Sequence, residues 1–274
     1  MPQTPAPGAV SIEPPRTENV DAALRDGVAI VTLNRPDKRN AVNDAMRADM
    51  ITVFDWADRD PAVRAIVVTG SGKGFCAGGD IAAMRERLAA PIGQVAMNGW
   101  NRQRRTHHLL TLLHGIPKPT IAAVNGAAAG LGCDLALCCD FVVASREATF
   151  VMSYVLRGLI PDGGGMYFLP RRVGLARAKQ LIFSGRMIGA EEALGIGMIE
   201  QIAEPDSVID DALALADTMT AGSPDALALA KSIMQQSLES SLDEVFALGC
   251  QAQGICYTTD NHREAVSAFL DRRK

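Results

Sequence analysis

The 274-residue sequence lacks the features of several protein classes. No apolar run approaches the roughly 18 residues that a membrane-spanning helix needs, so we expect no membrane partner. The amino-terminal segment has no basic stretch followed by an apolar one, and we therefore expect no secretory signal there. The formal net charge is -4, from 27 basic and 31 acidic side chains, which gives no support to nucleic-acid binding. These absences together predict a cytoplasmic protein.

The spacing that metal ligands require is also missing. Six cysteines and four histidines are scattered along the chain, and no cysteines form a CxxC pair. Structural zinc sites use short repeated spacings of these residues, so we expect no metal site. The thiols are expected to be reduced and mostly buried.

Strand, loop and helix patterns alternate over most of the chain. Short β-branched or apolar runs predict buried strands, and amphipathic segments between them predict helices. One helix is expected to be capped by Asn43, another to begin near Ile81, and a third to cover roughly 99–115. This alternation indicates the α/β class. The predicted strands cover residues 28–34, 65–70, 118–126 and 141–145.

The same patterns divide the chain into three parts. Residues 1–18 are rich in proline and predict a flexible leader. Residues 19–205 hold the alternating core. Residues 206–274 show long amphipathic patterns without strands, which predict a helical segment whose apolar faces pack on the core or on a neighbouring subunit.

Two loops of small residues each precede a predicted helix, "GKGFCAGGD" at 72–80 and "AAAGLG" at 127–132. Neither has the GxxxxGK[ST] pattern of a phosphate-binding loop, and the dinucleotide pattern GxGxxG fails because Phe75 stands at its last glycine. Backbone amides at helix N-termini favour a developing negative oxygen, so two such loops can form an oxyanion hole. Glycines that only make tight turns remain the alternative.

Five segments in order carry a family resemblance: "NRPDKRNAV" (34–42), "GFCAGGDI" (74–81), "KPTIAAVNGAAAGLGCDLALCCDFVVAS" (118–145), "IPDGGG" (160–165) and "AEEALGIGMIEQI" (190–202). Together they resemble the crotonase superfamily, also called the enoyl-CoA hydratase/isomerase family. The resemblance implies a spiral of ββα turns with a C-terminal helical trimerisation segment, and a homotrimer or dimer of trimers. It also implies an acyl-CoA thioester substrate and no cofactor, since coenzyme A is part of the substrate.

The resemblance assigns an oxyanion hole to two backbone amides. Gly79 follows the Ala-Gly pair of the first loop, and Leu131 holds the matching position in the second. The thioester carbonyl oxygen is expected to lie between these amides. Their N–H groups would stabilise the enolate that forms when an α-proton leaves.

Other matching positions are expected to contact coenzyme A. In the first segment and the glycine loop, two basic side chains suit its phosphates and two alanines offer backbone to its adenine. A terminal segment resembles one that lies near the phosphates bound by an adjacent subunit. These positions are Lys38, Arg39, Ala41, Ala77, Phe269 and Lys274.

The chain departs from the hydratase pattern of the family, which uses two glutamates around a water. The matching positions hold Asp134 and Tyr154, and an unperturbed phenol titrates near pH ~10. Asp162, beside a glycine run, matches a place where isomerising relatives can carry a functional aspartate. An isomerase needs only one carboxylate to move a proton. A helix N-cap is the alternative role for Asp162.

We therefore predict an enoyl-CoA isomerase-type enzyme, with Asp162 as acid/base and Asp134 and Tyr154 shaping the polar end of the site. The alternatives are a hydratase that adds water to a trans-2-enoyl-CoA, an acyl-CoA hydrolase or dehalogenase, and a non-catalytic acyl-CoA binder. Asp80 and Asp140 are expected to hold loops in place through hydrogen bonds.

Overall fold

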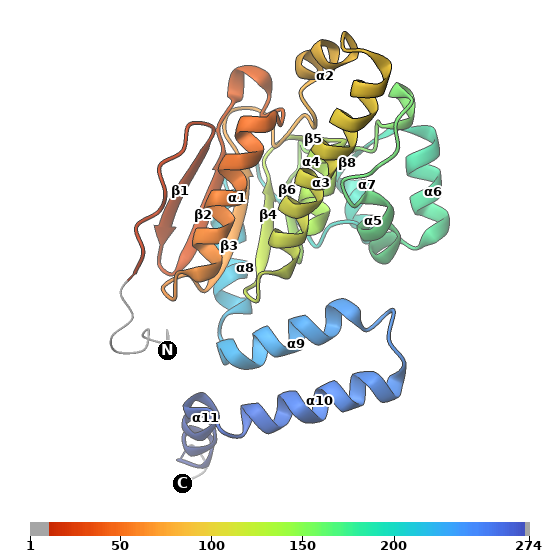
Figure 1. Ribbon diagram of the computed structural model, residues 1–274. Helices are drawn as coiled ribbons and strands as arrows, with labels where there is room; N and C mark the ends of the chain where they lie inside the picture. Colours follow the sequence, from red (N-terminus) through yellow and green to blue (C-terminus); the bar gives the residue numbers. More distant parts are fainter. Residues whose placement is uncertain (1–10, 272–274) are drawn as a thin grey trace. The chain divides into compact units, whose positions relative to one another are not determined.

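The computed structural model describes residues 11–271, apart from the side chains at positions 86 and 87 (Figure 1). Internal contacts divide these residues into one compact unit up to Ala216 and a second from Asp217 onward. Within the described residues, no helix is both long and apolar enough to cross a membrane.

A six-stranded sheet forms the centre of the first unit, in the order β1-β2-β3-β4-β6-β9. β1 and β2 form an antiparallel hairpin, and every later pairing in this sheet is parallel. β3 is buried at every residue, as expected of a parallel strand covered on both faces. The strands are β1 (Val20–Arg25), β2 (Val28–Leu33), β3 (Ala65–Gly70), β4 (Thr120–Val124), β6 (Phe141–Ser145) and β9 (Gln201–Ala203).

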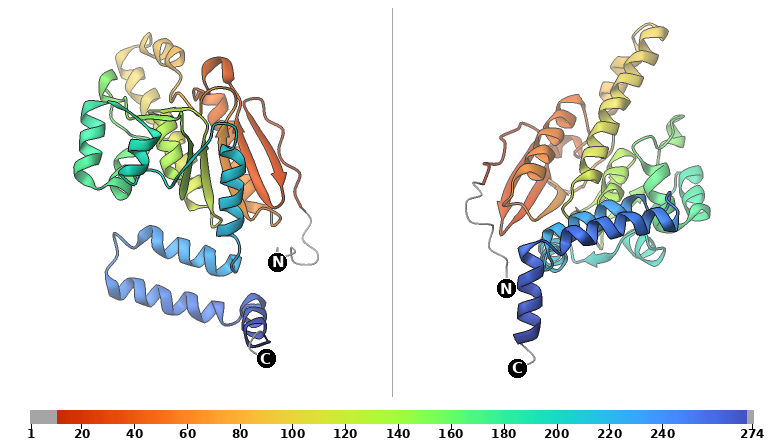
Figure 2. Two further views of the ribbon diagram at one scale, coloured as in Figure 1. Left: turned by 180° about the vertical axis from the view of Figure 1, so that it is seen from behind. Right: turned by 60° about the horizontal axis from the view of Figure 1, so that its bottom comes forward.

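Helices cover both faces of this sheet. α1 (Asp44–Arg59), α3 (Ile92–Gly115) and α4 (Leu131–Cys138) contribute to the larger apolar cluster, and α8 (Val208–Met219) packs its alanines against the opposite face (Figures 1 and 2). Asn43 caps α1 by accepting a hydrogen bond from the Met46 amide, as predicted. The remaining helices of this unit are η1 (Pro36–Lys38), α2 (Ile81–Leu88), η2 (Val155–Arg157), α5 (Gly165–Val173), α6 (Leu175–Ser184) and α7 (Ala190–Gly195).

A second, three-stranded sheet lies beside the first. β5 (Ala127–Ala129) pairs in parallel with β7 (Thr149–Val151), and β7 pairs antiparallel with β8 (Met187–Gly189). β5 leads through Gly130 directly into α4, so the second glycine loop is part of a sheet on one side and a helix on the other.

The second unit is helical. α9 (Pro224–Gln236) and α10 (Leu242–Cys256) lie antiparallel and side by side, and α11 (Asp260–Asp271) follows (Figure 1). None of these three helices has a buried residue, and large apolar side chains such as Met234, Leu242 and Phe246 are exposed.

The predicted α/β class is confirmed, and the four predicted strands appear as β2, β3, β4 and β6. One prediction differs from the structure. α3 begins at Ile92 rather than near residue 99.

Candidate active site

The two glycine loops are joined by a short parallel bridge. The Cys76 amide donates to the Ala127 carbonyl oxygen at 3.1 Å, and the Ala129 amide donates to the Cys76 carbonyl oxygen at 2.9 Å. The Cys76 thiol donates to the Asn40 carbonyl oxygen at 3.1 Å. Burial raises the pKa of this thiol to about 12, so it remains protonated at neutral pH. The bridge fixes the first loop against β5, which leads into α4.

Glycine is required where the loops meet. Gly78 has φ +90°, and a Cβ added there would overlap the Ala129 carbonyl oxygen and lie 3.3 Å from the Leu131 nitrogen. A Cβ on Gly132 would overlap the Cys76 carbonyl oxygen. Any larger residue at these positions would push the loops apart. The alternative in which these glycines only make tight turns is therefore insufficient, because they also permit close approach of two backbones.

The amides of Gly79 and Leu131 lie on the two joined loops. Neither N–H group has an acceptor within the described part of the chain, although the next amide in the first loop, that of Asp80, donates to Val42. Leu131 is the first residue of α4, where backbone donors are free and carry partial positive charge. The structure thus brings together two unpaired donors, which is the arrangement that an oxyanion hole needs.

The "DKRNAV" turn lies against the outer side of the first loop. The Ala77 amide donates to the Arg39 carbonyl oxygen at 2.9 Å, and the Val42 amide donates to the Gly78 carbonyl oxygen at 2.7 Å. The side chains of Lys38 and Arg39 are exposed at the end of η1. Ala41 is half-buried and Ala77 is exposed. Backbone hydrogen bonds from Ala77 to Arg39 and from Ala41 to Lys38 make these four residues, which are expected to contact coenzyme A, neighbours in space.

Asn40 supports this loop from inside. It is fully buried with φ +56°, and its Nδ2 donates to the carbonyl oxygens of Ser71, Gly74 and Phe75 at 2.9–3.2 Å. Its Oδ1 accepts from the Arg35 amide at 2.9 Å. The side-chain amide therefore satisfies backbone groups that a loop of this shape leaves without partners.

Asp80 closes the loop at the start of α2. Its carboxylate accepts from the Ala82 amide at 3.0 Å and from the Arg35 guanidinium at 3.1 Å. Burial opposes ionisation, but the Arg35 hydrogen bond and the Ala83 amide lower the pKa of Asp80 below its ordinary value. Asp140 accepts from the amide and hydroxyl of Thr120, so the prediction that both aspartates hold loops is confirmed.

Asp134 is fully buried in the first turn of α4, where it accepts a hydrogen bond from the Tyr154 hydroxyl group. Its other oxygen, Oδ1, has no partner among the described residues. Burial raises the pKa of Asp134 from 3.8 to about 7; the Tyr154 hydrogen bond lowers it, and the charge of Asp162 raises it further. Burial and the charge of Asp134 raise the pKa of Tyr154 well above 10, so the phenol stays protonated.

The glycine run at 163–165 packs directly on this carboxyl group. A Cβ at Gly163 would overlap Oδ2 of Asp134, and one at Gly165 would overlap Oδ1. The intervening Gly164 has φ +96°, a conformation that favours glycine. The run therefore encloses the Asp134 carboxyl group with backbone, which excludes water from it.

Asp162 lies at the edge of this enclosure. Its side chain is half-buried, and burial raises the pKa of its carboxyl group. Its own amide, Arg102 and His107 act in the opposite direction. The cap of α5 is Gly164, with no side-chain hydrogen bond, so the interpretation of Asp162 as a helix cap is wrong.

Arg102 and His107 are neighbours of Asp162 that the sequence did not single out. Both lie on α3, and His107 Nε2 is 2.9 Å from the Asp162 carbonyl oxygen. The histidine has no acidic neighbour in the sequence, and its partner is 55 positions away. Only the fold, which brings α3 to the glycine run, reveals the pairing.

Two further residues were expected to contact coenzyme A. Phe269 is on α11 in the second unit, and its side chain is exposed. Lys274 is outside the described residues. Between residues 11 and 271, no three histidine, cysteine or acidic side chains lie close enough together to bind a metal ion.

A family profile described as "Enoyl-CoA hydratase/isomerase" matches residues 23–274. The chain belongs to this family. A curated family member, the 1,2-epoxyphenylacetyl-CoA isomerase of Escherichia coli K12, is 39% identical over 91% of this chain and 94% of its own. The crotonyl-CoA hydratase of Syntrophomonas wolfei is 33% identical over 94% of this chain and 96% of its own.

Solved family structures share the fold. The crystal structure of an enoyl-CoA hydratase from Polaromonas sp. JS666 superposes with a TM-score of 0.86 at 34% identity, covering 92% of this chain and 97% of the other. The crotonase-type fold expected from the sequence motifs is therefore confirmed.

Replacing Gly132 with alanine is expected to separate the loops. The added methyl group meets the Cys76 carbonyl oxygen, so we expect the free energy of unfolding to fall by about 1–3 kcal/mol. Turnover should fall about a hundredfold or more as the Leu131 amide moves. Urea unfolding and thioester turnover measure both effects. Gly115→Ala, where no atom lies within 4 Å, is the matched control, and equal behaviour of the two variants would contradict the close approach.

The raised pKa of Asp134 predicts a pH-dependent stability. The folded state binds the Asp134 proton more tightly than the unfolded chain does. The resulting contribution to the free energy of unfolding is therefore fully present below about pH 4 and is lost as the pH rises to about 7. Urea unfolding across this range should show a decline that Asp134→Asn lacks. Asp206 is exposed, so Asp206→Asn should show the same decrease of the free energy of unfolding with pH as the wild-type protein. Parallel curves for all three proteins would show that Asp134 does not titrate in this way.

Proposed function

We propose that this chain isomerises the double bond of an unsaturated acyl-CoA thioester. The thioester carbonyl oxygen binds between the amides of Gly79 and Leu131, whose N–H groups stabilise the enolate. The Asp162 carboxylate takes a proton from C2 of a 3-enoyl group and returns it to C4, while the double bond moves to C2–C3. The product has the same atoms and the same charge as the substrate, so the reaction needs no added reactant.

The hydrogen bond between Tyr154 and Asp134 carries this proposal. In a hydratase these two positions would flank the water that adds to the substrate. Here they hydrogen-bond to each other. Because the pKa of Tyr154 is raised well above its ordinary value, the phenol keeps its proton near neutral pH and cannot accept another. Asp162 is the remaining carboxylate beside them, and its half-buried side chain has access to a ligand. The Escherichia coli relative is also named an isomerase, although the substrate in its name is an epoxide of a coenzyme A thioester.

Water addition is the second candidate. The Syntrophomonas wolfei relative is named a hydratase, and the pKa of Asp134 near 7 suits a group that exchanges a proton at neutral pH. The two reactions differ in product mass. An isomerase product has the mass of its substrate, and a hydratase product is heavier by one water. Release of free coenzyme A would indicate hydrolysis, and an unchanged but bound substrate would indicate a binder.

Asp162→Asn is expected to lower turnover of a 3-enoyl-CoA at least about a hundredfold, because the amide cannot accept the proton. Mass spectrometry and chromatography of the product should show a moved double bond with wild-type protein. Equilibrium binding of a saturated acyl-CoA should be unchanged in the variant. Asp206→Asn controls for the loss of one negative charge. Full turnover in Asp162→Asn, or a product heavier by water, would overturn the proposal.

We also propose that coenzyme A lies along the "DKRNAV" turn, with Lys38 and Arg39 near its phosphates and Ala41 and Ala77 offering backbone groups to the adenine. The exposure of both basic side chains and the hydrogen bond from Ala77 to Arg39 support this placement. The same turn is bonded to the Gly78 carbonyl oxygen, so a ligand along it leads toward the Gly79 amide.

The exposed apolar side chains of α9, α10 and α11 support self-association, and we propose a homotrimer or dimer of trimers. Analytical ultracentrifugation of the whole chain should give a mass three or six times that of the 29.1 kDa chain. Phe246→Asp, which places a charge among these side chains, should lower that mass. A wild-type monomer would contradict the proposal.

A further inference from the structure

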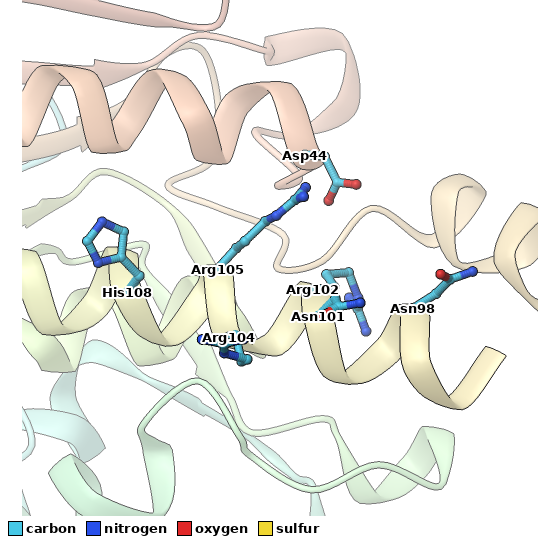
Figure 3. Close-up of a pocket in the computed structure, with 7 residues that line it drawn as sticks. All are labelled: Asp44, Asn98, Asn101, Arg102, Arg104, Arg105 and His108. Atoms are coloured by element: carbon cyan, nitrogen blue, oxygen red, sulfur yellow. The ribbon is translucent and has the colours of Figure 1, made fainter. Parts of the chain in front are cut away.

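A pocket of about 800 Å³ opens between the start of α1 and the middle of α3 (Figure 3). Asp44 contributes from α1, and every other lining residue comes from α3. This volume lies within the range of small-molecule sites. We call it the Arg105 pocket. No large apolar side chain lines it, which sets it apart from a pocket for a hydrocarbon tail.

The lining is rich in donors and positive charge. Arg102, Arg104, Arg105 and His108 lie along α3, and Asn98 and Asn101 add amide groups one or two turns earlier. The only carboxylate among these lining residues, Asp44, is already ion-paired with the buried Arg47 at 2.6 Å. The pocket therefore favours an anionic group with several acceptor oxygens.

Arg105 is the side chain most available to a ligand. It extends from α3 toward Asp44, whereas Arg104 lies on another side of the helix over the Trp100 ring at 4.9 Å (Figure 3). Arg105 and His108 make no hydrogen bond or ion pair with any residue of the described chain. The fold therefore does not need the Arg105 guanidinium.

The pocket adjoins the proposed reaction site on two sides. Arg102 lines it and is close enough to Asp162 for its charge to act on that carboxyl group. On the other side, Asp44 stands two positions after Val42, whose backbone pairs with Gly79. The pocket lining is thus linked to the oxyanion loop through Asp44 and Val42, and to Asp162 through Arg102.

We propose that the Arg105 pocket binds a carboxylate at the far end of the acyl group, so that the preferred ligands are coenzyme A thioesters of dicarboxylic acids. This inference rests on the proposed function, because it requires the thioester to bind at Gly79 and Leu131. A guanidinium fork matches a carboxylate in two parallel hydrogen bonds. An apolar chain end would instead leave these charged groups desolvated without a partner.

Equilibrium binding of saturated thioesters tests this inference apart from turnover. Adipyl-CoA and hexanoyl-CoA have equal carbon counts and differ in one terminal carboxylate, as do suberyl-CoA and octanoyl-CoA. We expect the dicarboxylic member of at least one pair to bind about tenfold more tightly, and less so at high salt. Arg105→Leu should remove this preference, and it should bind hexanoyl-CoA at least as tightly as the wild-type protein does, because the leucine needs no polar partner. Arg177→Gln, an exposed arginine on α6, should keep the preference.

Equal affinity within both pairs for the wild-type protein would overturn the inference. A loss of affinity for free coenzyme A in Arg105→Leu would also overturn it, since the pocket would then hold a phosphate of the coenzyme. Neither result depends on isomerisation. Failure of the isomerase assay with a retained binding preference would instead reject the proposed reaction and keep the pocket assignment.

Discussion

The active site depends on the parallel bridge between Cys76 and Ala128, because this bridge sets where two unpaired amides point. An amide stabilises an enolate only when it is already oriented toward the oxygen before charge develops. Gly78 and Gly132 allow the backbones to approach, and Asn40 holds the first loop from inside through carbonyl groups. The loop sequence is thus constrained more by backbone packing than by side-chain chemistry.

A second constraint is the enclosure of Asp134. A buried carboxyl group with one unpartnered oxygen is costly when ionised, and the structure accommodates it by a raised pKa and by a hydrogen bond from Tyr154 to the other oxygen. The glycine run excludes water from this group while it places Asp162 nearer to the exterior. Two acids in one site therefore have different environments, which is a common way to give them different roles.

The sequence predicted the parts of the fold that are long or strongly patterned. β3 and β6 are short, mainly apolar runs, and Asn43 is a residue type that caps helices well. The residues next to each other in the sequence are therefore enough to predict these elements. β5, β7, β8 and β9 have three residues each and depend on neighbours for pairing, so no periodicity marks them. β1 turns Val20, Ala22 and Leu24 inward in alternation, a signal too weak to predict a strand from the sequence.

The site residues were predicted from the family motifs more than from the chemical properties of the individual residues. The family resemblance placed Gly79, Leu131, Asp134, Tyr154 and Asp162, and the structure brings the two amides together on joined loops and the three side chains together beside the glycine run. The neighbours of Asp162 and the Arg105 pocket could not be predicted, because α3 meets these groups only through tertiary packing. Burial, which sets the pKa of Asp134, is likewise a property of the fold.

The most direct test of the account is the infrared spectrum of a saturated acyl-CoA carrying a ¹³C-labelled thioester carbonyl, bound to the protein. Two amide donors at Gly79 and Leu131 should polarise the carbonyl group and move its stretching band to lower frequency than in water. A band at or above its position in water would mean that these amides do not bind the thioester oxygen. The oxyanion hole, and the reaction built on it, would then be wrong.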